Sequence, residues 1–356
     1  MGKPYKVAVI GPGAIGSGVI RGILKNPAFQ LVGVKAYNPA KAGKDVGELA
    51  GVDPVGLKAT LELDDILKLD TDCVLYISQT YVGTNQIEEQ ISLLAAGHNV
   101  IGIGQYQALD LVDPPLHKRF VEAALKGGST YHTTGVDPEF FSERLVLLFS
   151  ALQHSISHIE LWEISPSDTI GDESLKACGF GQSMEEANAN HFSMGLGSIL
   201  LVPTMRRLAA RMGYPIDRVE VKPEHVAAPF DIDIGRAKAP KGTLAGISRR
   251  YDCYSGDHLF YTHRDYYYLS PLGPPPIVQN PDCYVLRIEG EPSIEMTLSF
   301  SKSLRTGELY DEKNRLKPAF VATAALVLNA VPAVVAAPPG IYEYPEPPSW
   351  VGASRV

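Results

Sequence analysis

The chain has 356 residues, of which 45% are hydrophobic and 20% charged, and its formal net charge is −8. This length corresponds to about two domains, each large enough to bury a core without disulfide or metal staples. The apolar content excludes wholesale disorder, and the acidic balance argues against a nucleic-acid partner, because binding a phosphate backbone needs a basic surface. A small anionic ligand held by backbone N–H groups stays compatible with this charge.

Cysteine usage and hydropathy exclude further classes. The four cysteines are far apart and form no CxxC pair: Cys73, Cys178, Cys253 and Cys283. We therefore expect reduced thiols rather than a zinc ribbon or a redox motif. The N-terminus lacks a signal-peptide pattern, and the longest apolar run, residues 319–337, is interrupted by Asn329 and Pro332. We expect a soluble, cytoplasmic protein with no membrane partner.

The first 140 residues alternate between strand and helix patterns. Short apolar runs predict strands at residues 6–10, 31–34, 72–77, 99–103 and 130–133. Helical spacing predicts helices at residues 13–24 and 87–96, and a third that opens at Pro114-Pro115 and ends at Gly127-Gly128. Strands separated by helices indicate an α/β fold with a doubly wound parallel sheet.

The pattern changes from about residue 155. A strand at residues 156–164 and helices over 184–212 precede a series of strand-like runs: residues 218–226, 231–237, 243–253, 258–269, 283–288 and 293–300. Successive strands without helices imply an α+β domain with a mainly antiparallel sheet. A late apolar helix, residues 318–336, is expected to return to the first domain. The predicted domains are residues 1–140 with 318–345, and residues 141–317.

The letters GPGAIG, from Gly11 to Gly16, form the pattern GxGxxG directly after a strand and at the start of a helix. Here Gly11 permits a tight turn, Gly13 lets the backbone approach a pyrophosphate, and Gly16 allows close helix–strand packing. The amides of Ala14 and Ile15 begin a helix whose positive dipole end favours phosphate. The motif predicts a Rossmann-type NAD(P)-binding domain, with a ligand-free turn as the alternative.

The segment after the second strand bears on cofactor choice. NAD enzymes usually carry Asp or Glu there for the ribose hydroxyls, whereas residues 35–41, KAYNPAK, contain no carboxylate. Lys35 and Lys41 are placed to meet a 2′-phosphate and Asn38 to hydrogen-bond it, unless the lysines are solvated surface residues. We predict NADP, with NAD as the possible alternative.

Several segments together resemble one known group. They are GPGAIG, Lys41–Gly56, Asp70–Gln79, His132–Leu145, Cys178–Gly181 and Asn329–Ile341. These segments are similar to dihydrodipicolinate-reductase-like dehydrogenases, which include 2,4-diaminopentanoate dehydrogenase and the native amine dehydrogenases. The resemblance implies a homodimer whose second domain supplies the substrate pocket and the dimer sheet. Its amine dehydrogenase branch reduces a ketone plus ammonia to a primary amine with NAD(P)H.

The resemblance also exposes a departure. In that branch a glutamate in a G-E-[FEY] pattern is the acid/base for ammonia and imine, but here the matching residues are Gly104, Gln105 and Tyr106. An amide can orient an amine but cannot take its proton. Four explanations stay open: a preformed imine or carbonyl as substrate, another residue as base, a one-residue shift in register, or replacement of the glutamate by its near-isostere. Asp137 is the nearest candidate for a substitute base.

Other candidates follow the ends of strands, where open α/β sheets bind ligands. Ser78 and Gln79 are expected to line the nicotinamide ribose. Gly135 and Asp137 follow the strand at 130–133. Asp137 is either the N-cap of a helix starting near Pro138 or a site residue, and the matching family position is usually Asn.

The remaining candidates concern the cofactor and substrate pocket. Asn329 either caps a turn at Pro332 or points into the cofactor site, and the resemblance favours the second. Glu163 resembles an acid of the family's pocket wall, with a solvent-facing glutamate as the simpler alternative. Six aromatic residues are candidates for an apolar cage, although each could be core: Phe140, Phe141, Phe180, Tyr261, Tyr266 and Tyr268. The histidines show no metal-ligand spacing, so no metal is expected.

We therefore expect an oxidoreductase of the amine dehydrogenase type, which transfers hydride between NAD(P)H and the imine of a small carbonyl compound and ammonia. One alternative is an imine or carbonyl reductase that does not use ammonia. Another is a non-catalytic dinucleotide-binding protein. Dihydrodipicolinate reductase activity itself is disfavoured, because the basic, His-rich motif for a dicarboxylate substrate is missing from the second domain.

Overall fold

The computed structural model describes residues 2–78, 85–103, 108–168, 170, 172–189, 191–307, 317–345 and 347–352, with only the backbone at 172–174 and 191–200. The chain divides into two compact units. The first comprises Met1–Glu139 and Ala319–Pro345, and the second comprises Phe140–Pro318 and Glu346–Val356. Each unit is therefore completed by a segment from the far end of the chain.

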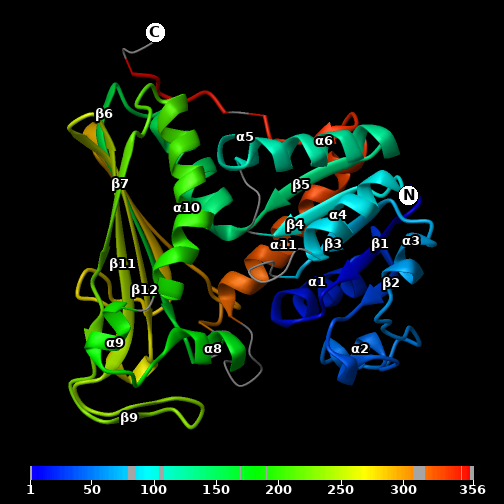
Figure 1. The fold of residues 1–356 in the computed structure, drawn as a ribbon, viewed down its shortest axis with the longest axis horizontal. Helices are drawn as coiled ribbons and strands as arrows, with labels where there is room; N and C mark the ends of the chain where they lie inside the picture. Colours follow the sequence, from blue (N-terminus) through cyan, green and yellow to red (C-terminus); the bar gives the residue numbers. More distant parts are fainter. Residues whose placement is uncertain are drawn as a thin grey trace. The chain divides into compact units, whose positions relative to one another are not determined.

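The first unit is built on a six-stranded parallel sheet in the order β15-β5-β4-β3-β1-β2 (Figure 1). Its strands are β1 (Tyr5–Ile10), β2 (Phe29–Lys35), β3 (Cys73–Tyr76), β4 (Val100–Ile103), β5 (Thr130–Thr134) and β15 (Gly340–Ile341). β1 lies between β2 and β3, so the direction of winding reverses between β1 and β3. In open α/β sheets such a switch point is where ligands bind, beyond the carboxyl ends of the strands.

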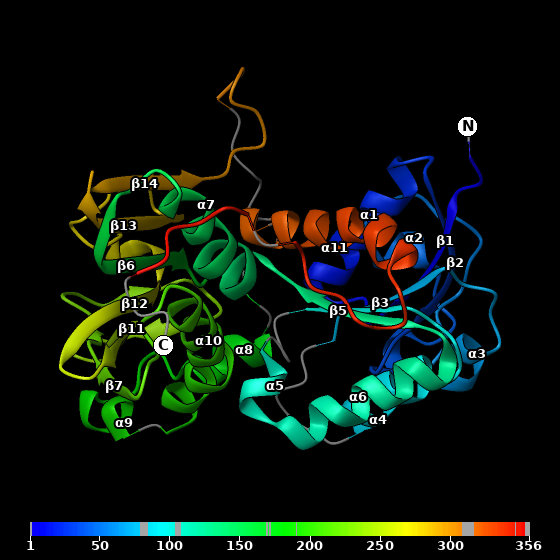
Figure 2. The ribbon, with the colours of Figure 1, turned by 90° about the horizontal axis from the view of Figure 1, so that it is seen from above.

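Helices cover both faces of this sheet (Figure 2). One face packs against α1 (Ala14–Lys25), α2 (Val46–Leu49) and α11 (Pro318–Ala336), and the other against α3 (Leu63–Leu67), α4 (Asn85–Ala95), α5 (Leu109–Val112) and α6 (Pro114–Gly127). Alternate residues of β1 serve the two cores: Val7 and Val9 face the first layer, and Ala8 and Ile10 the second. This two-sided burial explains why the strands are apolar throughout.

α11 corrects one expectation from hydropathy. By length and composition alone it could cross a membrane. Its buried residues instead share one core with α1 and the sheet of the first unit: Ala324, Val327, Leu328, Ala330, Val331 and Val334. The helix continues through Pro332, so that proline does not interrupt the apolar stretch. Packing within the first unit accounts for the apolar composition.

The second unit contains a seven-stranded, mainly antiparallel sheet in the order β14-β13-β6-β12-β11-β7, with β8 beside β11. Its strands are β6 (Ser155–Pro166), β7 (Arg218–Pro223), β8 (Val226–Ala227), β11 (Leu244–Ser255), β12 (His258–Tyr268), β13 (Cys283–Glu291) and β14 (Ile294–Ser299). β6 and β12 pair in parallel. The predicted strand at 231–237 belongs to a separate ribbon of β9 (Ile232–Asp233) and β10 (Lys238–Ala239).

The helices of the second unit are α7 (Val146–Ser150), α8 (Asp172–Cys178), α9 (Met184–Ala189) and α10 (His191–Arg211). α10 runs along the sheet at β7, β11 and β12 (Figure 1). A helical segment with a wide turn, Val136–Leu145, contains the point at which the chain passes from the first unit to the second. The predicted fold class, a Rossmann-type parallel sheet with a second, mainly antiparallel sheet, is confirmed.

Candidate functional site

The glycine-rich turn joins β1 to α1. Gly11 has a φ of +91°, a conformation that favours glycine, and its N–H donates to the Lys35 carbonyl at 2.9 Å. A Cβ on Gly16 would lie 2.1 Å from the Gly11 carbonyl oxygen. By contrast, among the described residues no atom lies within 4 Å of a Cβ built on Gly13. The turn is therefore closely packed at its two ends and open over its middle glycine.

The open side of the turn suits an anion. Gly13 is the N-cap of α1 and has no side chain to occupy the first amides of the helix, and Gly13 and Ala14 are exposed. The first turn, from Ala14 through Ile15, carries no charge. Lys41 Nζ donates to the Pro12 carbonyl at 2.6 Å, which holds an ammonium group beside the turn. Burial lowers the pKa of Lys41.

The segment after β2 differs from what the sequence suggested. Asn38 Oδ1 accepts from the Ala40 N–H at 2.9 Å and caps a short 3-10 turn, Pro39–Lys41. Lys35 is neither a solvated lysine nor a free cation. Its side chain is only 4% exposed, and Nζ lies 3.1 Å from a carboxylate oxygen of Glu89 on α4. A lysine buried at the end of a strand needs such a partner, and this one comes from another element of the unit.

The end of β3 adds hydroxyl groups to the same edge of the sheet. Ser78 is half-buried, and its Oγ accepts from Gln86 Nε2 at 3.0 Å. The Tyr76 hydroxyl donates to Glu89 at 2.8 Å. The other residues predicted near this edge, Gln79, Gln105 and Tyr106, lie outside the described residues.

The end of β5 carries Gly135, which is buried, and Asp137, which is half-buried with extended dihedrals, as an N-cap residue has. The bond between Asp137 and Pro138 is cis. Glu139, a residue that the sequence did not single out, is buried and accepts from Thr134 Oγ1 at 2.8 Å. No signal in the sequence marks it, because the burial of a glutamate five residues beyond the end of β5 depends on packing.

Asn329 is exposed on α11, whereas its neighbours Leu328 and Ala330 are buried. The argument that a buried amide needs a partner therefore does not apply to it. Its assignment to the cofactor site remains a prediction from the resemblance.

In the second unit Glu163 lies in a row of polar side chains on one face of the sheet. Register aligns Tyr284 of β13, Glu163 of β6, Asp265 of β12 and Arg249 of β11 in one row. Glu163 accepts from the Tyr267 hydroxyl at 2.5 Å and from the Tyr284 hydroxyl at 3.1 Å. Burial raises the pKa of Glu163, although the two hydroxyls oppose this. The carboxyl is thus held in place and shifted toward the proton-bound form.

The same face holds further buried charges. Arg249 and Asp265 form an ion pair with contacts of 2.6 and 2.8 Å. In the next row Lys317 Nζ donates to Ser165 Oγ at 2.9 Å, and burial lowers the pKa of Lys317. The sequence alone did not indicate this network, because its members come from separate segments and meet only once the strands pair.

The aromatic candidates do not form one cage. Tyr261 lies on the Glu163 face of β12, whereas Tyr266 and Tyr268 lie on the opposite face with Trp162 and Val285. Alternation along a strand separates odd from even positions, so the three tyrosines cannot surround one substrate.

The phenylalanines take different positions within the second unit. Phe141 is buried against Tyr284, with ring centroids 4.7 Å apart. Phe140 is half-buried, and its ring lies 5.3 Å from the Arg144 guanidinium. Phe180 packs against the core around Ala245 and Leu269. Phe140 and Phe180 remain predicted pocket residues.

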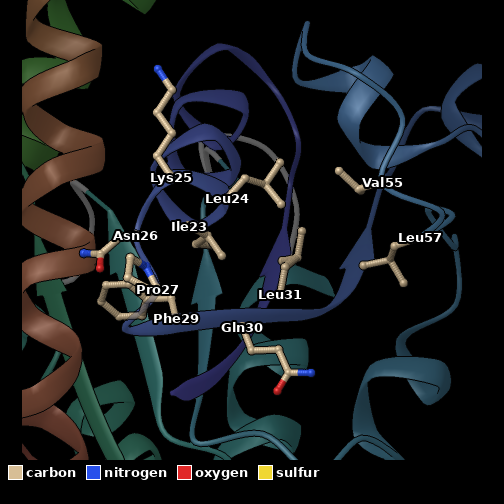
Figure 3. A pocket seen from close by; sticks show the side chains of 10 residues that line it. All are labelled: Ile23, Leu24, Lys25, Asn26, Pro27, Phe29, Gln30, Leu31, Val55 and Leu57. Atoms are coloured by element: carbon tan, nitrogen blue, oxygen red, sulfur yellow. The ribbon is translucent and has the colours of Figure 1, made fainter. Parts of the chain in front are cut away.

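A hollow of about 490 Å³ lies at the other end of β2 (Figure 3). It is lined by the end of α1 and the start of β2, from Ile23 to Leu31, together with Val55 and Leu57. This hollow is at the amino end of the strand, whereas the glycine-rich turn meets its carboxyl end. It is therefore separate from the candidate dinucleotide site.

Comparisons with known proteins agree with the fold. Residues 5–101 match the family model described as dihydrodipicolinate reductase, N-terminus. An amine dehydrogenase from Streptomyces virginiae is 27% identical over 356 residues, which cover 94% of each chain. A 4-hydroxy-tetrahydrodipicolinate reductase from Synechocystis is 36% identical over 182 residues, 49% of this chain and 62% of that protein. The structure of an amine dehydrogenase from Mycobacterium smegmatis has the same fold, with a TM-score of 0.75 over 95% of this chain and 94% of that chain at 20% identity.

Proposed function

From the match of residues 5–101 to the family model of the dihydrodipicolinate reductase N-terminus, we propose that the protein is an NAD(P)H-dependent oxidoreductase of the amine dehydrogenase type. Its reaction is hydride transfer between the nicotinamide and the imine formed from a small carbonyl compound and ammonia. The observation that carries the proposal is the turn from Gly11 to Gly16, open over Gly13 and followed by uncapped helix amides. Similarity to amine dehydrogenase along both chains supports the choice of reaction.

The residues of the first unit fit a dinucleotide. Its pyrophosphate would lie over Gly13 against the first amides of α1, with the Lys41 ammonium beside it. Lys41 and the Asn38 amide are the groups we assign to a 2′-phosphate, and on this basis NADP is the proposed cofactor. Comparing the dissociation constants of NADPH and NADH tests this choice, and a clear preference for NADH would overturn it while leaving dinucleotide binding intact.

The cofactor supplies the hydride, and the chain supplies binding and proton control. We assign to Gln105 the orientation of the amine nitrogen. A carboxyl group is then needed to exchange the proton of ammonium, and Glu163 is our candidate because burial raises its pKa and two tyrosine hydroxyls hold its carboxyl in place. Asp137 is the second candidate for this role. A homodimer in the cytoplasm, with small-molecule substrates only, completes the proposal.

The decisive experiment measures cofactor oxidation with a panel of ketones and aldehydes, with and without ammonium. Oxidation that depends strictly on ammonium supports the proposal. Oxidation without ammonium identifies a carbonyl or imine reductase, and cofactor binding without turnover identifies a non-catalytic dinucleotide-binding protein.

One substitution sharpens the assignment of Gln105. If this residue stands at the acid/base position, Gln105→Glu should raise kcat/KM for reductive amination about 100-fold, because a positioned base contributes at least about that factor. Gln107→Glu, the same change two residues away, is the matched control and should leave the rate unchanged. An unchanged rate in both variants would place the acid/base elsewhere.

A further inference from the structure

We infer that Glu89, which reaches from α4 to the end of β2, sets the balance between NAD and NADP by holding Lys35 in a neutral pair. This inference rests on the proposed dinucleotide binding. Glu89 would act as a specificity-determining residue in place of the carboxylate that residues 35–41 lack. The sequence does not indicate this role, because α4 follows β3 in the chain and Glu89 is therefore distant in sequence from Lys35.

The contacts of Glu89 join three elements. One carboxylate oxygen lies 3.1 Å from Lys35 Nζ at the end of β2. The other accepts from the Tyr76 hydroxyl of β3 at 2.8 Å and from the Tyr37 hydroxyl. Burial raises the pKa of both tyrosines, so their hydroxyls stay protonated and donate to the carboxylate. Lys35 Nζ also lies 3.6 Å from the centre of the Tyr37 ring.

This cluster adjoins the predicted ligand site. The backbone carbonyl of Lys35 accepts the N–H of Gly11, so the residue that carries the ammonium group is hydrogen-bonded through its main chain to the glycine-rich turn. The adenosine ribose of a bound dinucleotide lies at the end of the second strand of such a fold. Tyr37, at 39% exposure, is the accessible member of the cluster, while Lys35 lies beneath its ring. A substituent on the ribose would therefore contact Tyr37 and experience the electrostatic field of the Lys35–Glu89 pair behind it.

The two members of the pair act on a 2′-phosphate with opposite signs. The Lys35 ammonium attracts it and the Glu89 carboxylate repels it, so the intact pair contributes little net charge. Neutralising Glu89 leaves an unbalanced cation and favours NADP. Neutralising Lys35 leaves an unbalanced carboxylate and favours NAD. A pair with only a structural role would instead change stability and leave the preference alone.

The test compares the dissociation constants of NADP⁺ and NAD⁺ on the same full-length protein by calorimetric titration. Their ratio is insensitive to a loss of folded protein, because both ligands report on the same folded fraction. We expect Glu89→Gln to shift the ratio toward NADP⁺ about tenfold and Lys35→Met to shift it toward NAD⁺ by a similar factor. The double variant Lys35→Met/Glu89→Gln should return the ratio close to that of the wild type.

Glu88→Gln is the matched control. It removes the same charge from the neighbouring position of α4, where Glu88 pairs with Arg119 at 2.7 Å on the surface, and the ratio should stay within about twofold. Ratios that do not move, or that move in the same direction in both single variants, overturn the inference. Where a single variant does not fold, the other single variant and the double variant still decide the sign. If the wild type binds neither dinucleotide, the proposed function is overturned as well. If it binds but the ratios do not shift as expected, only the inference about Glu89 fails.

Discussion

The two units place polar groups in different ways. In the first, the ligand site comes from the backbone of consecutive residues between Gly11 and Gly16, shaped by one left-handed glycine and one close approach. In the second, four strands each contribute one side chain to the row from Tyr284 to Arg249. A slip of one residue in any pairing would turn a member of the row to the other face. A local motif can therefore be recognised in the sequence, whereas a row of side chains can be predicted only once the register of the paired strands is known.

The strongest way to break the row is to remove one member of its buried ion pair. The side chains of Arg249 and Asp265 are 10% and 1% exposed, so Arg249→Met leaves a buried carboxylate without its cation. We expect the free energy of unfolding to fall by about 3–5 kcal/mol, measured by denaturant titration. Arg119→Met, which removes an exposed pair with Glu88, should cost less than about 1 kcal/mol. Equal losses in the two variants would contradict the burial of the row.

The glycine-rich turn offers two substitutions with separable effects. Gly16→Ala places a methyl group 2.1 Å from the Gly11 carbonyl oxygen, and we expect a loss of stability of about 3 kcal/mol. Gly13→Ala has a compatible φ of −84° and meets no atom of the described chain within 4 Å. It should leave stability within about 0.5 kcal/mol but weaken dinucleotide binding about tenfold or more, since the methyl group occupies the space over the turn. Unchanged binding in Gly13→Ala would argue against a pyrophosphate there.

The second unit should also carry a pH dependence that the turn lacks, through His263 of β12, which is fully buried two residues before Asp265. Burial lowers the pKa of His263 to about 3, whereas in the unfolded chain it is about 6.5. Below pH 6.5 the His263 imidazole binds a proton in the unfolded state but not in the folded state, so stability falls as the pH drops toward 3. At pH 5 this loss amounts to about 2 kcal/mol relative to pH 7.

The measurement is the difference in unfolding free energy between the wild type and His263→Gln at pH 7 and at pH 5. The raised pKa values of Glu163 and Asp265 act in the opposite direction, but they are common to both proteins and largely cancel. We expect the advantage of the wild type to shrink by about 2 kcal/mol at the lower pH. A difference that is the same at both pH values would show that His263 exchanges its proton freely in the folded state.

Much of the fold could be predicted because its signals are local. The strands of the first unit are apolar runs, α6 begins at a proline after Asp113 and ends at Gly127 before the cap residue Gly128, and Gly11 to Gly16 form a motif. The partner of Lys35 could not be predicted, because Glu89 reaches it only after β2, β3 and α4 have packed. Glu139 is a similar case, since nothing local distinguishes a buried glutamate from an exposed one.

Asn329 shows a different limit of the sequence. α11 is apolar on nearly every side, so the spacing of its apolar residues does not indicate which face is buried. The predicted aromatic cage failed for a related reason. Tyr261, Tyr266 and Tyr268 are all aromatic and close in sequence, but alternation along β12 assigns them to opposite faces.

The return of Ala319–Pro345 to the first unit has a consequence for synthesis on the ribosome. α11 fills one core of this unit, and β15 pairs with β5 at the edge of its sheet. While the chain is being made, residues 1–139 therefore wait with one apolar layer uncovered and the β5 edge open until the last segment emerges. The core strands of the second unit are translated earlier than that segment and lie within one uninterrupted stretch, Phe140–Pro318. During synthesis the first unit, which contains the glycine-rich turn, therefore stays incomplete for the longest time. We expect protection of its exposed apolar surface by chaperones to matter most for this unit.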